Sequence, residues 1–309
     1  MTRLDGVLVL DKQAGMTSHA VVAAVRRAVK QAGVSAKRRH GPKVGHAGTL
    51  DPDATGVLVV CIGRATRLVP YLQASRKTYD ARMQLGVTTS TLDAAGEVQS
   101  TADASAVDEN ALCEALKSFV GDIEQIPPMV SAVKVGGERL YAKARRGEEV
   151  ERAPRPVTIH DIVLEDFVPG PRAEAAFLVT CSAGTYIRTL AADVGERLGV
   201  GAHLSSLRRL ASGRFSLEHA VDLDKVADLA GQGRLDEILL TPAQAVADYP
   251  HIVADEGLAE ALRHGKTLPP TGQAGPVAVV DGEHRLLGMV EDREGGARPL
   301  VVLAAGEKS

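Results

Sequence analysis

Short apolar runs closed by polar residues or glycine recur in the first third of the chain and predict buried strands. Residues 6–11 and 56–62 are almost continuously apolar, which is typical of strands covered on both faces. Residues 78–85 alternate between apolar and polar side chains, which predicts a strand with one buried face. Together these runs predict a sheet whose first strands lie in the first third of the chain.

Helical spacing appears between and after these runs. Val21, Val22, Val25 and Val29 share one helix face, Thr17-Ser18 supplies an N-cap, and Gly33 ends the segment. Further helices are predicted over residues 107–121 and 186–198, and further strands over 157–167 and 175–181. The mixture of strands and helices favours a mixed α/β (α+β) fold with a central sheet.

Two stretches interrupt this pattern. Residues 124–152 contain Pro127-Pro128 near their start and carry six Lys or Arg among glycines, so we expect an excursion from the core. Residues 241–250 are expected to be a linker. Beyond it, a helix over 254–264 and strands near 276–281, 285–291 and 299–304 predict a small β-rich second domain.

Composition changes this picture in one respect. The 309 residues are about twice the ~150 of an average domain, so the length allows two globular units or one large one. The formal net charge is −3, yet residues 1–50 hold nine Lys or Arg against two Asp, which is +7 and leaves −10 for the rest. This asymmetry predicts a local surface that binds a polyanion.

Several protein classes are excluded by what the sequence lacks. No apolar run approaches 18 residues, and the five-residue apolar stretch near the N-terminus is too short for a signal peptide. Cys61, Cys113 and Cys181 are far apart and have no close histidine, so neither a zinc site nor a disulfide framework is expected. We therefore expect a cytoplasmic protein that needs no metal or cofactor.

The segment over residues 45–58, GHAGTLDPDATGVL, is the strongest candidate for chemistry. Its glycines allow backbone conformations closed to other residues, and Pro52 fixes the turn after Asp51. Asp51 is thus predicted to lie on a rigid loop that leads into a buried strand. A carboxylate in such a place can be a nucleophile or a base, but it can equally cap a turn.

Seven segments in one order resemble motifs of the bacterial tRNA pseudouridine-55 synthases, which isomerise a uridine in the T loop of tRNA. They are GVLVLDKQAGMTS at 6–18, GHAGTLDPDATGVL at 45–58, KTY at 77–79, TSTLD with Gly96 at 89–96, PPMVSAVK at 127–134 with Arg145 and Gly147, SAGTYIR at 182–188, and LRR at 207–209. Gln13 and Val130 depart from the family pattern, which has proline and tyrosine there. The last 60 residues resemble, loosely, the small β domain called PUA.

The resemblance implies a pseudouridine synthase fold in which Asp51 is the catalytic carboxylate. Asp51 attacks the ribose or the base, or starts a glycal route with proton loss at C2′, which the family favours. It must be ionised, and Arg188 is expected to supply the paired charge that keeps its pKa low in a dry site. Tyr79 is expected to stack on the flipped base and to be available for proton transfer.

The remaining site residues follow from the same resemblance. Tyr186 is expected at the base edge, Leu207 against the base, and His46 on the RNA side of the flipped nucleotide. Lys12, together with the basic loop over 37–43, is a candidate for phosphate contacts. Lys134 belongs to the 124–152 insertion, which is expected to grip the T arm, and Asp93 is expected to support the site.

The implied organisation has a catalytic domain over residues 1–245 and a PUA-like RNA-binding domain over 250–309. The expected partner is the T arm of tRNA; no membrane and no obligate protein partner are expected, and the default state is a monomer. Two alternatives remain open. Asp51-Pro-Asp53-Ala-Thr55 also satisfies the DxDxT pattern of Mg²⁺-dependent aspartyl-phosphate phosphatases, although no apolar strand precedes it. The chain could instead bind or refold RNA without catalysis.

Overall fold

A nine-stranded mixed sheet runs through most of the molecule in the computed structural model, which describes residues 4–33, 43–131, 134–135, 138–139, 146, 148 and 150–303. Its strands lie in the order β1-β3-β12-β4-β11-β10-β7, with β2 paired to β3 and β13 paired to β12. Their bounds are β1 Gly6–Lys12, β2 Val44–His46, β3 Thr55–Ile62, β4 Lys77–Leu85, β7 Gly121–Gln125, β10 Arg155–Val168, β11 Glu174–Cys181, β12 Ala202–Ser212 and β13 Phe215–Ser216. Only the β12–β3 pair is parallel among these described pairings, so the predicted mixed α/β class is confirmed.

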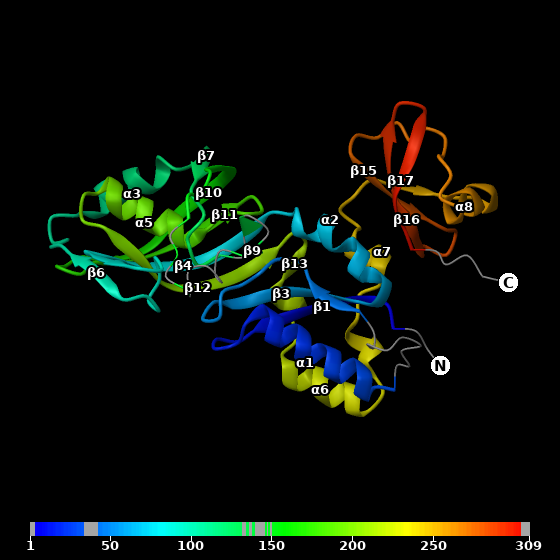
Figure 1. The fold of residues 1–309 in the computed structure, drawn as a ribbon, viewed down its shortest axis with the longest axis horizontal. Coiled ribbons are helices and arrows are strands. Elements are labelled where there is room, and N and C mark those ends of the chain that lie inside the picture. Colours follow the sequence, from blue (N-terminus) through cyan, green and yellow to red (C-terminus); the bar gives the residue numbers. More distant parts are fainter. Residues whose placement is uncertain are drawn as a thin grey trace.

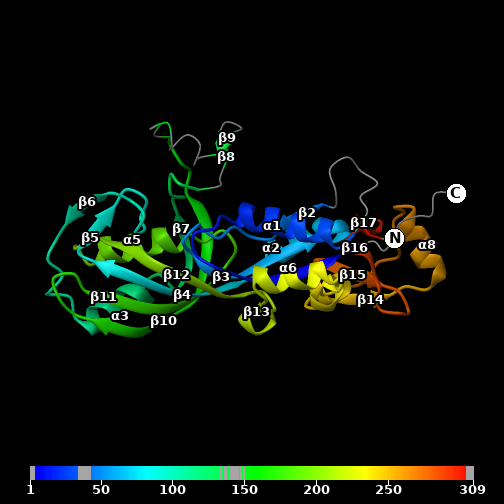
Figure 2. The ribbon, with the colours of Figure 1, turned by 90° about the horizontal axis from the view of Figure 1, so that it is seen from below.

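Helices cover the two ends of this sheet (Figure 1). Near β1 and β3 lie α1 Ser18–Gln31 and α6 Leu223–Gly231, which pack side by side (Figure 2). Near β10 and β11 lie α3 Glu109–Lys117 and α5 Ile187–Arg197. The short helical elements are η1 Gly63–Leu68, α2 Val69–Gln73, η2 Leu217–His219, η3 Leu235–Ile238 and α7 Pro242–Ala245. Two further strand pairs lie off the main sheet. They are β5 Val87–Thr89 with β6 Val98–Thr101, and β8 Lys134–Val135 with β9 Glu138–Arg139.

The continuous apolar runs of β1 and β3 are explained by burial on both faces. Leu8, Leu10 and Leu58 pack on the side of α1 and α6, whereas Val7 and Val9 pack on the opposite side with α2 and α7. Alternate residues of one strand thus enter two separate cores. The N-terminus of α1 forms as predicted, because the Thr17 side chain accepts a hydrogen bond from the Ala20 N–H at 3.0 Å.

Some predicted elements differ from the structure. The helix predicted over 107–121 ends at Lys117, because Gly121 already begins β7, which pairs with β10 and belongs to the main sheet. The excursion therefore starts after Gln125 rather than at residue 124. The linker predicted over 241–250 contains α7, which begins with a capping box formed by Thr241 and Gln244. The sequence also gave no sign of β12, the strand that joins β3 to β4.

A separate four-stranded sheet forms the predicted β-rich C-terminal unit (Figure 1). Its order is β14 His251–Val253, β15 Pro276–Val280, β16 Leu286–Arg293 and β17 Gly296–Val302, with α8 Glu256–Arg263 packed on it. Arg64 joins this unit to the first sheet, because its guanidinium contacts Asp5 at 2.7 Å and donates to the Leu303 carbonyl at 2.8 Å.

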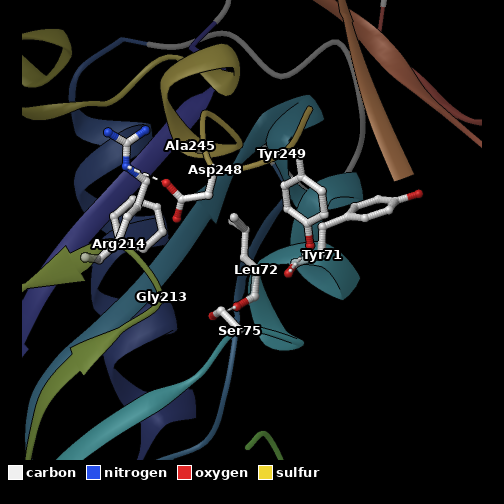
Figure 3. A pocket seen from close by; sticks show the side chains of 9 residues that line it. Tyr71, Leu72, Ser75, Gly213, Arg214, Ala245, Asp248 and Tyr249 are labelled. Atoms are coloured by element: carbon white, nitrogen blue, oxygen red, sulfur yellow. Dashed lines mark hydrogen bonds and ion pairs between the residues drawn. The ribbon is translucent and has the colours of Figure 1, made fainter. Parts of the chain in front are cut away.

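Two tyrosines complete this junction. The Tyr249 hydroxyl donates to the Tyr71 carbonyl at 3.0 Å, and the two rings meet edge to face with centroids 6.0 Å apart. Beside them is a pocket of about 150 Å³, with Arg214 and Asp248 at its rim (Figure 3). It lies where α2, the β12–β13 turn and the segment after α7 meet.

Gly56 makes the parallel β12–β3 pairing possible. Its φ is +100°, and a Cβ at this position would lie 2.2 Å from the Arg209 carbonyl oxygen and 2.7 Å from the Arg209 nitrogen. We predict that Gly56→Ala lowers the free energy of unfolding by about 3 kcal/mol, from backbone strain plus overpacking. Chemical denaturation checks this. Gly45→Ala is the matched control, since a Cβ there meets no atom within 4 Å, and equal losses in both variants would contradict the prediction.

Candidate active site

Asp51 lies on a loop between β2 and β3 that is fastened on both sides. On the N-terminal side, the buried Ser18 hydroxyl accepts from the Leu50 N–H and donates to the Leu50 carbonyl, both at 2.9 Å. On the C-terminal side, the Lys12 ammonium donates to the Pro52 carbonyl at 2.8 Å and to the Ala54 carbonyl at 2.6 Å. The Asp51 backbone is therefore fixed, as the motif predicted.

Arg188, the second residue of α5, holds the Asp51 carboxylate. Its side chain is 4 % exposed, and its Nε lies 3.0 Å from Asp51 Oδ2 while Nη2 donates to Oδ1 at 3.4 Å. This two-pronged contact fixes the plane of the carboxylate as well as its position. The Asp51 side chain itself remains 41 % exposed, so part of the carboxylate stays open to an incoming group.

The rest of the Arg188 guanidinium is occupied by a second carboxylate and two carbonyls. Nη1 contacts Asp93 Oδ2 at 3.3 Å and donates to the Thr91 carbonyl at 3.1 Å, and Nη2 donates to the Val130 carbonyl at 2.7 Å. Asp93 is held in turn by the Thr91 hydroxyl and by the Ala95 N–H at 3.2 Å. One cation thus bridges two carboxylates, and Asp93 supports the site as the sequence suggested.

The net electrostatic effect on Asp51 is opposite to the sequence-based expectation. Burial, which removes bulk water from around the carboxylate, raises the pKa of Asp51, and it outweighs the lowering by Arg188. Asp93 and Asp53 add to the increase, and Lys12 opposes it. The expectation of a low pKa is therefore wrong, because one shared arginine cannot compensate both the lost hydration and a second carboxylate.

Three further predicted residues lie around this pair. Tyr79 is on β4 and 8 % exposed, and Tyr186 is the N-cap residue just before α5. Burial is the main cause that raises the pKa of both phenols, and the Asp51 charge adds to the increase. Leu207 lies on β12, opposite Ala81 of β4, so it is on the strand next to Tyr79. The three residues therefore come from β4, β12 and the start of the segment that carries Arg188.

Comparison with known proteins decides the family. A model of the "TruB family pseudouridylate synthase (N terminal domain)" matches residues 34–187, the "tRNA pseudouridylate synthase B C-terminal domain" matches 188–247, and "tRNA Pseudouridine synthase II, C terminal" matches 249–304. The tRNA pseudouridine synthase B of Symbiobacterium thermophilum is 52 % identical over 264 residues, 85 % of this chain and 83 % of that protein. The chain belongs to the TruB family of pseudouridylate synthases.

Other relatives extend this match over the whole length. The tRNA pseudouridine synthase B of Thermobifida fusca is 44 % identical over 307 residues, which covers 97 % of this chain and 99 % of that protein. Among solved structures, a chain of a Cbf5-Nop10-Gar1 complex superimposes with a TM-score of 0.72 at 29 % identity, covering 97 % of this chain and 85 % of that one. The pseudouridine synthase fold with a PUA-like C-terminal unit is thereby confirmed.

Within this TruB-family site, Lys12 has a role other than the one expected. It is 2 % exposed, and its ammonium donates hydrogen bonds to the carbonyls of Gln13, Pro52 and Ala54. Burial lowers its pKa to about 8. A buried ammonium with three carbonyl acceptors has no free N–H for a phosphate. We therefore assign Lys12 to holding the Asp51 loop.

Of the other expected RNA contacts, His46 lies on β2, and several others lie beyond the described part of the chain. His46 ends β2, where it is opposite Val60 of β3, and it is partly exposed. Lys134 begins β8, which rises from the sheet with β9 (Figure 2), but its side chain is outside the described residues. Residues 37–42 of the basic loop, Arg145 and Gly147 also lie outside them, whereas Lys43 is exposed.

The position of Asp51 does not fit the phosphatase alternative. The strand follows Asp51 instead of leading into it, since β2 ends at His46 and β3 begins at Thr55, so the DxDxT arrangement of a phosphatase does not form. In the described part of the chain, no cluster of three or more His, Cys, Asp or Glu could hold a metal ion. The pocket in Figure 3 contains neither Asp51 nor Arg188.

Sequence reasoning missed two contributors to the site. The Val130 carbonyl binds Arg188, and a main-chain acceptor leaves no residue-type signal. Arg209, fully buried beside Tyr79, was noticed only as part of the LRR segment. Residue type offered no signal for its burial, because β12 has no regular apolar alternation and the neighbouring Arg208 is partly exposed.

Proposed function

We propose that this chain isomerises a uridine in the T loop of tRNA, position 55, to pseudouridine, and that Asp51 starts the reaction. The observation that carries this proposal is the Asp51–Arg188 ion pair. The Arg188 side chain is buried and holds the Asp51 carboxylate, while part of that carboxylate stays exposed. Such a group can reach a ribose carbon while its own position does not change. The names of the close relatives support the tRNA substrate.

The reaction needs little beyond these groups. The target nucleotide must first leave the folded T loop, which costs a few kcal/mol. Asp51, ionised, then acts on the ribose so that the bond from C1′ to N1 breaks. The uracil rotates and rejoins C1′ through C5; C5 then loses its proton to solvent, and N1, freed from the ribose, takes up a proton. No atom is gained or lost overall, because the product is an isomer of the substrate.

The surrounding side chains have distinct tasks in this proposal. Tyr79 stacks on the extruded uracil, Tyr186 contacts its edge, and Leu207 lines the space opposite. His46 faces the RNA and supports the flipped nucleotide. Arg188 keeps the Asp51 carboxylate oriented and balances its charge while water is excluded.

The reaction rate is predicted to fall in mildly acidic solution. Because burial raises the pKa of Asp51 above its ordinary 3.8, the ionised form is lost on acidification earlier than for an exposed aspartate. The single-turnover rate should therefore rise with pH and then level off, with a midpoint above 3.8. Rates measured at saturating enzyme across a pH series will show this rise, which is the acidic limb of the pH–rate profile.

A second carboxyl group provides the control for this pH dependence. Asp193 on α5 is also partly buried, and burial with the nearby Glu196 raises its pKa to about 6. Asp193→Asn should leave the acidic limb in place if Asp51 causes it. A limb that disappears in this variant would assign the pH dependence to the wrong group and contradict the prediction.

The wider organisation is part of the proposal. Residues 1–245 form the catalytic domain and residues 250–309 a PUA-like RNA-binding domain. The insertion within 124–152, including Lys134, grips the T arm, and the basic N-terminal region adds phosphate contacts. The chain acts as a monomer in the cytoplasm. Among the described residues, no helix is long and apolar enough to cross a membrane.

Tritium release from a tRNA transcript labelled with [5-³H]uridine tests the proposal. Release requires loss of the C5 hydrogen, and the assay is run with EDTA so that a need for divalent metal would be seen. Mapping pseudouridine in the recovered tRNA identifies the modified position. A folded chain that binds tRNA and releases no tritium would instead support the RNA-binding alternative.

A further inference from the structure

Arg209 is the largest side chain that the described part of the fold buries completely, and the proposed reaction leaves it without a task. It is 1 % exposed and lies near the C-terminal end of β12. Its backbone is paired with Gly56 of β3 on one side and with Tyr79 of β4 on the other. Arg209 therefore occupies the point where the strand after Asp51 meets the strand that carries Tyr79.

The guanidinium of Arg209 reaches back to the Asp51 loop. Its Nη2 donates to the Gly48 carbonyl at 3.2 Å and its Nη1 to the Thr49 carbonyl at 3.4 Å, while Nε donates to the Val57 carbonyl at 2.7 Å. Thr49 is two residues before Asp51. One rigid planar group thus ties the entry of the loop to β3, the strand that follows it.

Arg209 and Tyr79 are directly paired residues of β12 and β4, so their side chains lie next to each other on one face of the sheet. Burial raises the pKa of the Tyr79 phenol, and Arg209 opposes this through its positive charge and its donors. Asp51 and Tyr79 come from segments with no direct hydrogen bond between them among the described contacts. Arg209 is the group that both share.

The charge at Arg209 is costly and is not explained by an ion pair. Among the described residues no carboxylate lies within 4.0 Å of it. Burial is the main cause that lowers the pKa values of Lys12 and Lys77 to about 8, and the charge of Arg209 adds to that lowering. A buried charge without a partner of opposite sign is unfavourable. An apolar side chain would fill this position without that cost, but it would supply none of the hydrogen bonds.

We propose that Arg209 is a positioning residue that fixes the Asp51 loop and the Tyr79 hydroxyl relative to each other. This rests on the proposed roles of Asp51 and Tyr79. Because the Arg209 fork is planar, its donors hold the two elements in one geometry in the absence of substrate. Arg209 does not reach the nucleotide itself, so its loss affects the reaction step and not the binding of tRNA.

Arg209→Lys tests this assignment, with Arg208→Lys as the matched control. Lysine keeps the charge but loses the fork, so the single-turnover rate should fall about 100-fold, as for a small misplacement of reacting groups. The tRNA dissociation constant should stay within about 3-fold of wild type, since a group that does not touch RNA contributes little to affinity. Arg208, on the same strand, pairs with Asp11 and should tolerate the change.

A double-mutant cycle with Tyr79→Phe separates positioning from a purely structural role. If Arg209 acts through the Tyr79 hydroxyl, Arg209→Lys should slow the Tyr79→Phe enzyme less than it slows wild type. Three outcomes would overturn the proposal. The rate losses of Arg209→Lys and Tyr79→Phe could multiply in the double variant, Arg209→Lys could react as fast as Arg208→Lys, or Arg209→Lys could weaken tRNA binding alone. Thermal unfolding of each variant shows whether the fold is retained.

A measurement that leaves Arg209 in place covers the case in which its variants do not fold. The side-chain N–H signals of Arg209 in an NMR spectrum of the full-length chain should shift when Tyr79 becomes Phe, because an acceptor is removed. Unshifted signals would overturn the proposal. Failure of the proposed function is distinguishable, since it would appear as absent tritium release by wild type, before any Arg209 variant is compared.

Discussion

Asp51→Asn is expected to abolish pseudouridine formation while leaving the protein folded and able to bind tRNA. The amide has the same shape as the carboxylate but cannot act as a nucleophile or a base. Removal of an essential group of this kind costs at least about 1000-fold in rate. Single-turnover tritium release from [5-³H]uridine-labelled tRNA, followed over hours with enzyme in excess, measures the loss.

The stability of this variant provides a second readout. Burial raises the pKa of Asp51, so the ionised carboxylate is disfavoured in the folded state and weakens the fold as pH rises through that pKa. Asparagine removes this pH-dependent contribution. The difference in unfolding free energy between Asp51→Asn and wild type should therefore move in favour of the variant between acidic and neutral pH. A difference that stays constant over this range would contradict the raised pKa.

The control for Asp51→Asn is Asp53→Asn. Asp53 is two residues away on the same loop and is exposed, and no described hydrogen bond ties it to Arg188. Its replacement changes the local charge by the same amount. Activity close to wild type in this variant assigns the loss to the Asp51 carboxylate, whereas equal losses would indicate an effect of charge on tRNA binding.

The Asp51–Arg188 contact shows what the sequence could and could not predict. The motif around Asp51 indicated a rigid loop before a buried strand, and both are present. The partner lies 137 positions away, and only the family resemblance linked the two residues. The direction of the Asp51 pKa depends on how much water the fold removes and on Asp93 sharing the arginine, and neither can be obtained from residue spacing.

Lys12 and β12 are two features that depend on tertiary packing and that the sequence pattern therefore did not predict. A lysine in a basic segment is normally solvated, and only the fold of residues 52–54 over it makes it a buried donor to main-chain carbonyls. The strand over Ala202–Ser212 carries two arginines and no clean alternation of apolar residues, so the periodicity of a strand was absent. Its pairing with both β3 and β4 satisfies its main-chain N–H and C=O groups. This pairing depends on strands that are distant in the sequence, so local periodicity does not reveal it.

Arg188→Met is expected to have the second-largest effect. Methionine has about the length of the aliphatic part of arginine but leaves Asp51, Asp93 and two main-chain carbonyls without their shared donor. Loss of preorganised donors and charge costs about 100- to 1000-fold in rate. The unpaired buried groups lower the free energy of unfolding by about 2 kcal/mol. Single-turnover kinetics and chemical denaturation check the two effects.

The pH profile identifies the reason for the loss. Without Arg188, the charge that lowers the pKa of Asp51 is gone while burial and Asp93 still raise it, so the acidic limb of the rate should move to higher pH. Arg188→Lys keeps a positive charge but not the two-pronged contact, so its limb should move less while its plateau rate still falls. If both variants keep the wild-type midpoint, Arg188 orients Asp51 without controlling its charge, and the electrostatic half of the proposed mechanism is wrong.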